Sequence, residues 1–349
     1  MSVPCSSFTD HKPATEQCSP WKLSVAPMLD WTDRHYRYLA RLLSPHARLY
    51  TEMVHAGAIL YGERENFLKF HSLEHPLALQ LGGNDPKQLA QACRLAQKYQ
   101  FDEINLNGGC PSPRVTKGSF GATLMLQVKL AIDCLRAMQD STELEVTFKH
   151  RIGVDKECSY SWLRDFVGQI AYESQCQVFI VHARNAWLKG LSPKENRRVP
   201  PLNYEYVHRL KQDFPQLTIV LNGGITNLQA VQTQIAHVDG VMVGRQAYRY
   251  PLSLLSWEQV LFNESYNLDE TTLIRQLYLY AEEELKANPQ IKLKNIVKHY
   301  LGLFHGWPNA RIWRRMLSNT VHLEANNPQI ILDAFAAFRQ TSPLKIKEL

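Results

Sequence analysis

Short runs of apolar and β-branched residues recur along the first two thirds of the chain, and polar or glycine residues follow each run. Runs of this length, bounded by turn-forming residues, are typical of buried β-strands. The pattern predicts strands over residues 23–26, 49–53, 77–81, 103–107, 146–149, 178–181, 218–221 and 240–243. The chain is therefore expected to contain a large sheet.

Amphipathic stretches lie between most of these strands and carry apolar residues at three- and four-residue spacing, which predicts helices. The clearest cover residues 86–99, 123–139, 160–173, 204–214 and 228–236. Three of them are preceded by candidate N-caps, Asp85, Asn203 and Asn227. Strands that alternate with helices form a parallel sheet, and eight such units over about 230 residues match an α/β fold of the closed (β/α)8 TIM barrel type. An open doubly wound sheet is the alternative, but no G-x-G-x-x-G follows the first strand.

Only helical patterns remain after Tyr250. They predict helices over residues 271–286, 291–304, 310–317 and 329–339, with prolines in the turns between them. The first residues of the chain are polar, contain prolines and lack the apolar core of a signal peptide. We therefore expect a disordered N-terminal tail over residues 1–20, a barrel domain over 21–255 and an all-helical domain over 256–349.

The composition is that of a folded protein, since 45% of the 349 residues are hydrophobic and 21% are charged. No apolar run approaches the roughly 18–20 residues that a membrane span needs, so we expect a cytoplasmic protein. The seven cysteines include no C-x-x-C pair, which argues against a disulfide framework and against structural zinc. No metal site is expected, and we expect a monomer because no feature of the sequence indicates an oligomer.

The carboxyl ends of the strands form the active site in a (β/α)8 barrel, and here several of these ends are polar or glycine-rich. The last two carry Asn222-Gly223-Gly224 and Gly244-Arg245. Glycines let backbone N–H groups approach an anion, and the last two loops of this fold commonly bind phosphate. The net charge of the chain is +6, and Arg245 adds a cation at this point. We therefore expect a ligand that bears a phosphate.

Three further strand-end residues are candidates for ligand contacts: Gln80, Lys149 and His182. Taken singly, Lys149 or His182 is better explained as a solvated strand-end residue, or as a histidine satisfied by the backbone. Taken together with the other polar ends, they indicate a ligand with several hydrogen-bond acceptors. The Gln80 amide can both donate and accept, which suits the edge of an isoalloxazine ring.

Cys110 lies in a glycine-rich segment after the fourth predicted strand, which is not an environment for side-chain packing. A cysteine there could be a nucleophile, a metal ligand or a proton donor. A nucleophile usually needs a lowered pKa. A proton donor needs a thiol that is still protonated near pH 7, as a thiol with the ordinary pKa of about 8.5 is.

Together these motifs resemble those of the tRNA-dihydrouridine synthases, and in particular their A-type bacterial subfamily. The resemblance is carried by Ala26-Pro27-Met28 with Thr32-Asp33, residues 105–111, Lys149-His150-Arg151, residues 181–184, residues 186–197, Asn222-Gly223-Gly224 and Gly244-Arg245. It begins at Leu23 and leaves only the N-terminal tail unmatched. It implies a barrel that binds FMN, a C-terminal helical domain that binds tRNA, and NADPH as the reductant.

The resemblance also implies roles for single residues. FMN contacts are implied for Pro27, Met28, Gln80, Lys149, His182, Asn222, Gly223, Gly224, Gly244 and Arg245. Reduced flavin is implied to deliver hydride to the C5–C6 double bond of a uridine, at D-loop positions 20 and 20a in this subfamily. Cys110 would donate the proton, and Asn107 would help to place the uracil. The base must leave its stack to reach such a site.

The charge distribution independently favours RNA as a partner. The 38 residues from Lys286 to Leu323 contain seven Lys or Arg, no Asp or Glu, and interleaved aromatic residues. A solvated helix face is the common explanation of a basic run, but an acid-free basic and aromatic segment has the composition that RNA binding requires. By resemblance, tRNA contacts are expected at Lys194, Arg197, Arg311 and Arg314, and Arg315 could replace either of the last two. Asn309 stands where the family pattern has glycine, so the loop there is expected to differ.

Three other functions are open on the residues alone. A flavin barrel enzyme that acts on a free small pyrimidine would share the FMN contacts but would not need the basic helical domain. An RNA-binding or chaperone-like protein would not need Cys110. A phosphate-binding aldolase that uses Lys149 would carry no flavin colour.

Overall fold

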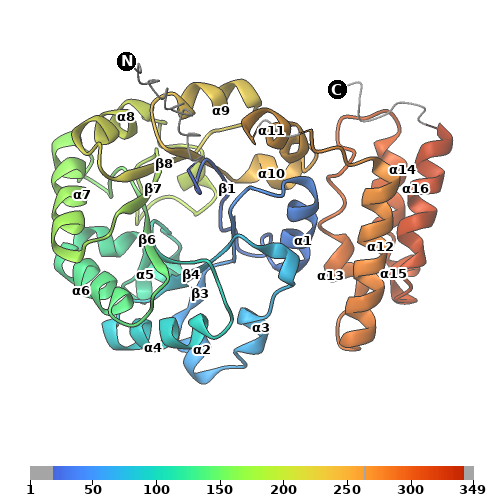
Figure 1. The fold of residues 1–349 in the computed structure, drawn as a ribbon, viewed down its shortest axis with the longest axis horizontal. Helices are drawn as coiled ribbons and strands as arrows, with labels where there is room; N and C mark the ends of the chain where they lie inside the picture. The colour runs from blue at the N-terminus through green and yellow to red at the C-terminus, as the bar shows by residue number, and fades with distance from the viewer. Residues whose placement is uncertain (1–18, 263–264, 342–349) are drawn as a thin grey trace, which may run out of the picture.

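The computed structural model describes residues 19–262 and 265–341, which form a barrel with a helical region beside it (Figure 1). Neighbouring strands of the barrel pair in parallel, and the last pairs with the first. The ring closes where Arg48 forms backbone hydrogen bonds of 2.9 Å with Leu23 and Val25. The eight strands are β1 (Leu23–Val25), β2 (Leu49–Tyr50), β4 (Leu77–Gly82), β5 (Glu103–Gly108), β6 (Glu145–Arg151), β7 (Val178–His182), β8 (Thr218–Asn222) and β9 (Gly240–Val243). The predicted TIM barrel is confirmed, and a short extra strand, β3 (Val54–His55), pairs with β4.

The barrel has an outer and an inner layer because successive side chains of a strand point to opposite faces. The outer side chains are apolar and form the main core with the helices. Inside the barrel, apolar residues such as Ile180 and Met242 form a second, separate cluster. The inner face of β5 is polar instead, because Glu103, Asn105 and Asn107 alternate with apolar neighbours and are all buried.

The helices between and after the strands lie mostly around the outside of the barrel (Figure 1). They are α1 (Arg34–Leu43), α2 (Ala56–Tyr61), α3 (Glu65–Leu68), α4 (Pro86–Gln97), α5 (Pro113–Lys117), α6 (Val128–Gln139), α7 (Tyr160–Ser174), α8 (Tyr204–Asp213), α9 (Leu228–Ile235), α10 (Arg245–Arg249) and α11 (Ser253–Phe262). The predicted N-caps Asp85, Asn203 and Asn227 all accept hydrogen bonds from backbone N–H groups of their helices. Short polar side chains therefore fix where α4, α8 and α9 begin.

The predicted helix over residues 123–139 is wrong in its first part. Residues Gly121–Leu126 form a 3₁₀ helix, and the non-helical backbone of Gln127 (φ −127°, ψ 61°) separates it from α6. The 3₁₀ segment packs below the Cys110 loop, where the Ala122 N–H donates to the Cys110 carbonyl oxygen over 3.0 Å. This contact to a distant loop prevails over the helical pattern of the local sequence.

The helical region packs around aromatic side chains of its own. It consists of α12 (Glu270–Ala287), α13 (Leu293–Val297), α14 (Ala310–Leu317), α15 (Thr320–Glu324) and α16 (Gln329–Thr341). Phe304 stacks on Phe338 with ring centroids 4.4 Å apart, and Trp313 is fully buried beside them. The helix predicted over residues 291–304 is shorter, because turns follow α13 and bring Gly302 against the barrel, where a Cβ would lie 2.9 Å from the Arg249 oxygen.

The helical region is attached to the barrel through α1. The ring of Tyr280 on α12 stacks on Tyr38 at 4.0 Å, and its hydroxyl lies 2.8 Å from His35 Nδ1. Asp33 caps the start of α1 with one carboxylate oxygen and meets His299 Nε2 at 2.9 Å with the other. Burial alone would raise the pKa of the Asp33 carboxyl, but the hydrogen bond and charge of His299 hold that pKa well below its usual range.

Residues 1–18 of the expected N-terminal tail lie outside the described residues. The expected boundary between residues 255 and 256 falls within α11. Within the described part of the chain, no helix combines the length and the apolar character that crossing a membrane requires.

Candidate active site at the barrel mouth

The ends of β8 and β9 bring the predicted phosphate-binding residues to one corner of the barrel mouth. Gly223 and Gly224 have left-handed backbones, with φ of +114° and +74°. A Cβ on Gly223 would lie 2.6 Å from the His182 ring, and one on Gly224 would lie 2.4 Å from Leu202. The chain can therefore turn this closely beneath the mouth only with glycine at both positions. Arg245 follows β9 as the first residue of α10.

Positive groups surround this corner. Burial lowers the pKa of His182 well below its ordinary value, and four positive groups lower it further: Arg151, Lys149, Arg184 and Arg245. Burial likewise lowers the pKa of Arg245, with further contributions from other arginines, the first of which is Arg197. A bound anion would relieve the repulsion between these cations. The corner is therefore suited to a phosphate-bearing ligand.

Lys149 and Asn222 are joined across the mouth. The Lys149 ammonium donates to Asn222 Oδ1 over 3.0 Å, and the Asn222 amide donates to the Met242 carbonyl oxygen over 2.7 Å. Enclosure by the barrel wall lowers the pKa of Lys149 to about 7, and the charge of Arg151 adds to the effect. Lys149 keeps further N–H donors for a ligand, since an ammonium has three.

The polar wall inside the barrel is a continuous series of side-chain hydrogen bonds. Gln80 Nε2 donates to Asn105 Oδ1 over 2.7 Å, and Asn107 Nδ2 donates to Gln80 Oε1 over 2.8 Å. Below them, Asn105 Nδ2 donates to Thr147 Oγ1 over 2.7 Å, and Thr147 donates to Glu103 over 2.5 Å. Gln80 thus has both ends of its amide engaged, which leaves one N–H for a ligand.

The Cys110 loop is fixed by hydrogen bonds to its backbone. Asn107 Oδ1 accepts from the N–H groups of Gly109 and Cys110 over 3.1 Å each. Arg151 Nε donates to the Gly109 carbonyl oxygen over 2.9 Å. The Cys110 side chain is half-buried, and its sulfur lies 3.5 Å from Ser112 Oγ. Cys110 is therefore a free thiol at the mouth, with its backbone held on both sides.

Arg151 is a residue whose role the sequence analysis did not identify. Besides the Gly109 oxygen, its guanidinium donates to the backbone oxygens of Asn185 over 3.1 Å and of Asn196 over 3.0 Å. It is 4% exposed, and burial lowers its pKa to about 10. Its fork of donors joins the Cys110 loop to the segment after β7. The neighbouring His150 faces away from the mouth and packs among Phe148, Phe166 and Phe179.

Pro27 and Met28 follow β1 on the other side of the mouth and are half-buried. The Met28 N–H donates to Thr32 Oγ1 over 2.9 Å, and the Thr32 N–H donates back to the Met28 oxygen over 2.9 Å. The Met28 sulfur lies beside Gly244, 3.6 Å from where a Cβ would be. The first and last strand ends of the barrel therefore meet at this point.

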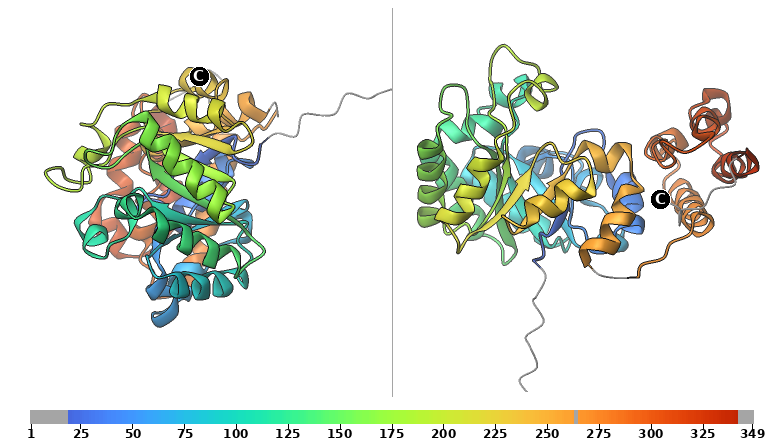
Figure 2. Two further views of the ribbon diagram at one scale, coloured as in Figure 1. Left: turned by 90° about the vertical axis from the view of Figure 1, so that its left-hand side faces the viewer. Right: turned by 90° about the horizontal axis from the view of Figure 1, so that it is seen from above.

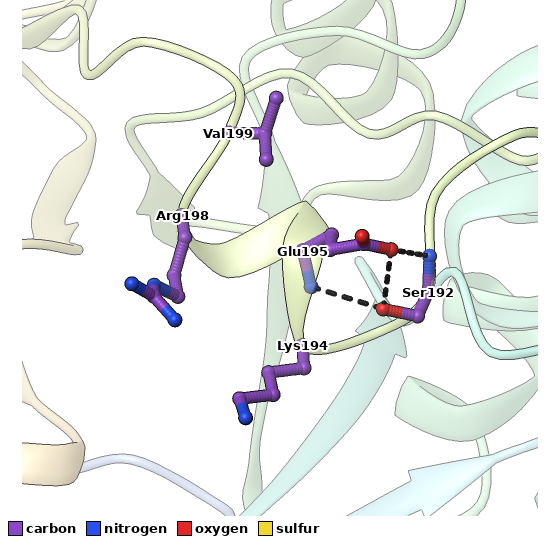
Figure 3. A pocket seen from close by; sticks show the side chains of 5 residues that line it. All are labelled: Ser192, Lys194, Glu195, Arg198 and Val199. Carbon is purple, nitrogen blue, oxygen red and sulfur yellow. Dashed lines mark hydrogen bonds between the residues drawn. The ribbon is translucent and has the colours of Figure 1, made fainter.

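The segment after β7 carries Lys194 and Arg197 and projects from one end of the barrel (Figure 2). Arg245 Nη2 donates to the Arg197 backbone oxygen over 3.2 Å, so this segment lies beside the phosphate corner. A depression of about 470 Å³ in the segment is lined by Ser192, Lys194, Glu195, Arg198 and Val199 (Figure 3). None of the strand-end residues lines it, so we place the chemistry at the barrel mouth and not here.

Arg311 and Arg314 lie on α14, in the helical region beside the barrel (Figure 1). Both side chains are exposed, as is that of Arg315. The opposite side of α14 is buried through Trp313 and Leu317, so the arginines form its outer face. The structure thus brings the predicted cofactor residues, Asn107 and Cys110 together, and it places these arginines apart from them.

One sequence signal could have revealed the polar wall. Polar and apolar residues alternate strictly through β5, which predicts a strand with a polar face. In a closed barrel, an alternating strand with apolar residues toward the helices must turn its polar residues inward. No clusters of His, Cys, Asp and Glu suited to a metal ion occur within the described residues.

Comparison with known proteins gives a consistent result. Residues 24–340 match the family "Dihydrouridine synthase (Dus)". The chain is 51% identical over 302 residues to the tRNA-dihydrouridine(20/20a) synthase of Escherichia coli (strain K12), covering 86% of this chain and 87% of the relative. It is 48% identical over 326 residues to the protein of the same name from Yersinia pestis, covering 93% and 94%. A solved complex of 2-naphthoyl-CoA reductase with 2-naphthoyl-CoA has a TM-score of 0.55 at 7% identity, covers 70% of this chain and 50% of that chain, and supports the fold alone.

Proposed function

The chain belongs to the dihydrouridine synthase family, and on that premise we propose that it reduces uridine at D-loop positions 20 and 20a of tRNA. The reaction adds two hydrogens across the C5–C6 double bond, so the enzyme is an oxidoreductase acting on CH–CH bonds. FMN is the cofactor, and NADPH is the reductant. The observation that carries this proposal is Cys110, a half-buried free thiol on a rigidly held loop beside the cationic corner of the barrel mouth.

The chemistry of the donor set supports FMN. The cations around His182 suit a phosphate, and the glycines after β8 allow close approach of a ligand there. The residues that would hold the phosphate end are Asn222, Gly223, Gly224, Gly244 and Arg245. The residues that would hold the ring and ribityl groups are Pro27, Met28, Gln80, Lys149 and His182. FMN supplies the hydride-transfer chemistry when bound, after reduction by NADPH.

Cys110 completes the addition from the protein side. Its S–H bond breaks, the proton moves to the uracil carbon that has not received hydride, and a thiolate remains. Arg151 and Lys149 are near enough to act electrostatically on the Cys110 sulfur, and their positive charges stabilise that thiolate. Asn107 lies directly before the loop and retains one amide N–H, with which it helps to place the uracil. Solvent returns a proton to the sulfur before the next turnover.

The tRNA is held by two basic surfaces. Lys194 and Arg197 lie on the segment that projects beside the mouth, and Arg311 and Arg314 lie on the outer face of α14. Arginine and lysine bind the phosphate backbone through charge and give no sequence preference by themselves. The target uridine must turn out of its stack, because the Cys110 sulfur lies within the mouth and not on an open surface.

The test is anaerobic. The purified protein is reduced with NADPH, and tRNA that lacks dihydrouridine is added while the absorption of oxidised flavin is followed. We expect the band to return with tRNA and not with free uridine. Return with free uridine alone would favour an enzyme of small pyrimidines. A protein that binds no flavin even when FMN is added would contradict the cofactor assignment and favour an aldolase-like use of Lys149.

A further inference from the structure

We infer that Glu103, deep inside the barrel, is a positioning residue for Cys110. It acts through a directed chain of buried side-chain hydrogen bonds that ends at the backbone of the Cys110 loop. The intermediate members are Thr147, Asn105, Gln80 and Asn107. The inference rests on the proposed function only in that Cys110 is the proton donor. The chain of hydrogen bonds is itself a property of the structure.

Glu103 starts the chain because its carboxylate can only accept. Oε1 receives the Tyr50 hydroxyl over 2.7 Å and the Thr147 hydroxyl over 2.5 Å. Oε2 receives Trp21 Nε1 over 2.8 Å and lies 3.2 Å from Arg48 Nη1. Trp21 Nε1 can only donate, Arg48 is a fixed cation beside Oε2, and the carboxylate has no hydrogen to give, so the Tyr50 and Thr147 hydroxyls both point their hydrogens at Oε1.

This constraint passes from one residue to the next. The Thr147 hydroxyl has a single hydrogen, which it gives to Glu103, so Thr147 can only accept from Asn105. Only the NH₂ end of the Asn105 amide can donate, and its oxygen must therefore face Gln80. Each amide in the series is thereby held in one of its two orientations.

The same logic fixes Asn107. The Gln80 amide donates to Asn105, so its oxygen is left to accept from the NH₂ group of Asn107. The Asn107 oxygen must then face the Cys110 loop, where the N–H groups of Gly109 and Cys110 meet it at 3.1 Å. If Asn107 turned over, its NH₂ group would face two other donors, and both hydrogen bonds to the loop would be lost.

The chain is also shielded from water, which gives each link its strength. Glu103, Asn105, Thr147 and Gln80 are at most 1% exposed, and Asn107 at the mouth is 9% exposed. Strand register brings the members together, since Asn105 pairs with Gln80 on one side and with Thr147 on the other. Loss of one hydrogen bond in the middle of this series should therefore change how the Cys110 loop is held.

The decisive variant is Thr147→Val, which removes the hydroxyl, keeps the side-chain shape and breaks the chain next to Glu103. Tyr50→Phe is the matched control, because it removes a second hydroxyl from the same oxygen of Glu103 without lying between Glu103 and Cys110. Thr147→Ser is the rescue, because it restores the hydroxyl. All three are compared with wild type as the FMN-loaded protein.

The first readout is the rate at which iodoacetamide alkylates Cys110. The tryptic peptide of residues 99–114 contains Cys110 as its only cysteine, and the peptide of residues 157–164 contains the exposed Cys158 as an internal reference. We expect Thr147→Val to change the Cys110 rate by about threefold or more, since one fixed amide orientation is lost. The alkylation rate of Cys158 should not change in any variant. The alkylation rate of Cys110 in Tyr50→Phe and in Thr147→Ser should stay near that of wild type.

The second readout separates the two half-reactions. Thr147→Val should slow flavin reoxidation by tRNA about tenfold, because misplacement of a reacting group lowers the rate steeply. Reduction by NADPH, which does not use Cys110, should slow by much less, since the hydrogen-bond chain reaches the flavin only through Gln80. Equal effects of Thr147→Val and Tyr50→Phe, or no effect of Thr147→Val on alkylation, would overturn the inference. If tRNA did not reoxidise the flavin of the wild-type protein at all, the proposed function would fail. The alkylation rates would still test whether the hydrogen-bond chain positions Cys110.

Discussion

The barrel mouth and α14 hold their polar groups in opposite ways. Lys149 donates to Asn222, and Arg151 donates to three backbone oxygens while almost fully buried. The side chains of Arg311 and Arg314 on α14 are exposed and, among the residues that the structure describes, form no hydrogen bond or ion pair. A change in the mouth therefore disturbs several neighbours, whereas a change on α14 removes one charge. The mouth should govern the rate of the chemistry, and α14 should govern the affinity for tRNA.

The largest effect is expected from Cys110→Ala. Loss of a positioned proton donor typically lowers a rate by 10²–10⁴, so flavin reoxidation by tRNA should fall about a thousandfold. FMN binding and reduction by NADPH should persist, because among the described residues the Cys110 side chain hydrogen-bonds only to Ser112 and holds none of the predicted FMN contacts in place. Stopped-flow measurement of both half-reactions checks this. Reoxidation at the wild-type rate would show that another group donates the proton.

The second prediction concerns Arg151, on which the coupling within the mouth depends. Arg151→Met removes three hydrogen bonds to backbone oxygens, of which the one to Asn196 is fully buried, and we expect the free energy of unfolding to fall by about 3 kcal/mol. Urea unfolding measures it. Arg151→Lys keeps the charge but cannot form the fork, so it should recover only part of the loss. Full recovery with lysine would mean that charge, and not the directed hydrogen bonds, holds the Cys110 loop.

The sequence predicts much of the barrel because buried parallel strands can be recognised from the residues of each segment alone. Most strands are short apolar runs, and polar residues that enter the mouth mark where they end, as at Lys149 and Asn222. The boundaries of α14 agree with the prediction for the same kind of reason, since its buried and exposed residues alternate with helical periodicity. These features depend on nothing beyond the segment itself.

The features that the sequence does not reveal depend on distant partners. The 3₁₀ segment Gly121–Leu126 is set by its contact with Cys110, and α13 is shortened where Gly302 meets the barrel. The roles of Arg151 and Thr147 depend on strand register and on loops far along the chain. A pattern read along one strand cannot supply that register.

The third prediction tests the charge of the mouth by pH. Lys149 has its pKa lowered to about 7, so its ammonium is charged below that pH and neutral above it. The dissociation constant for anionic FMN should therefore rise as the pH rises from 6 to 8.5. The rise should be about tenfold for each unit by which bound FMN raises the pKa of Lys149. Dissociation constants for FMN in wild type and Lys149→Met separate this effect from titration of the FMN phosphate. Identical pH dependence in both proteins would exclude Lys149 as the titrating group.

The smallest single effects should come from α14, and they complete the comparison. Arg311→Ala, Arg314→Ala and Arg315→Ala should each raise KM for tRNA about threefold and lower the slope of log affinity against log salt by about 1, with kcat unchanged. Because the side chains are exposed and share no partner, the effects should multiply in combination. Arg164 is an exposed arginine of α7, the helix on the opposite side of the barrel from α14 in Figure 1, and although it pairs with Asp165 at 2.8 Å, Arg164→Ala removes the same single charge and serves as the control for overall charge. If Arg164→Ala weakened tRNA binding equally, overall charge would explain the affinity. If the α14 variants lowered kcat instead, the helix would act on the chemistry, and the separation between mouth and helix would fail.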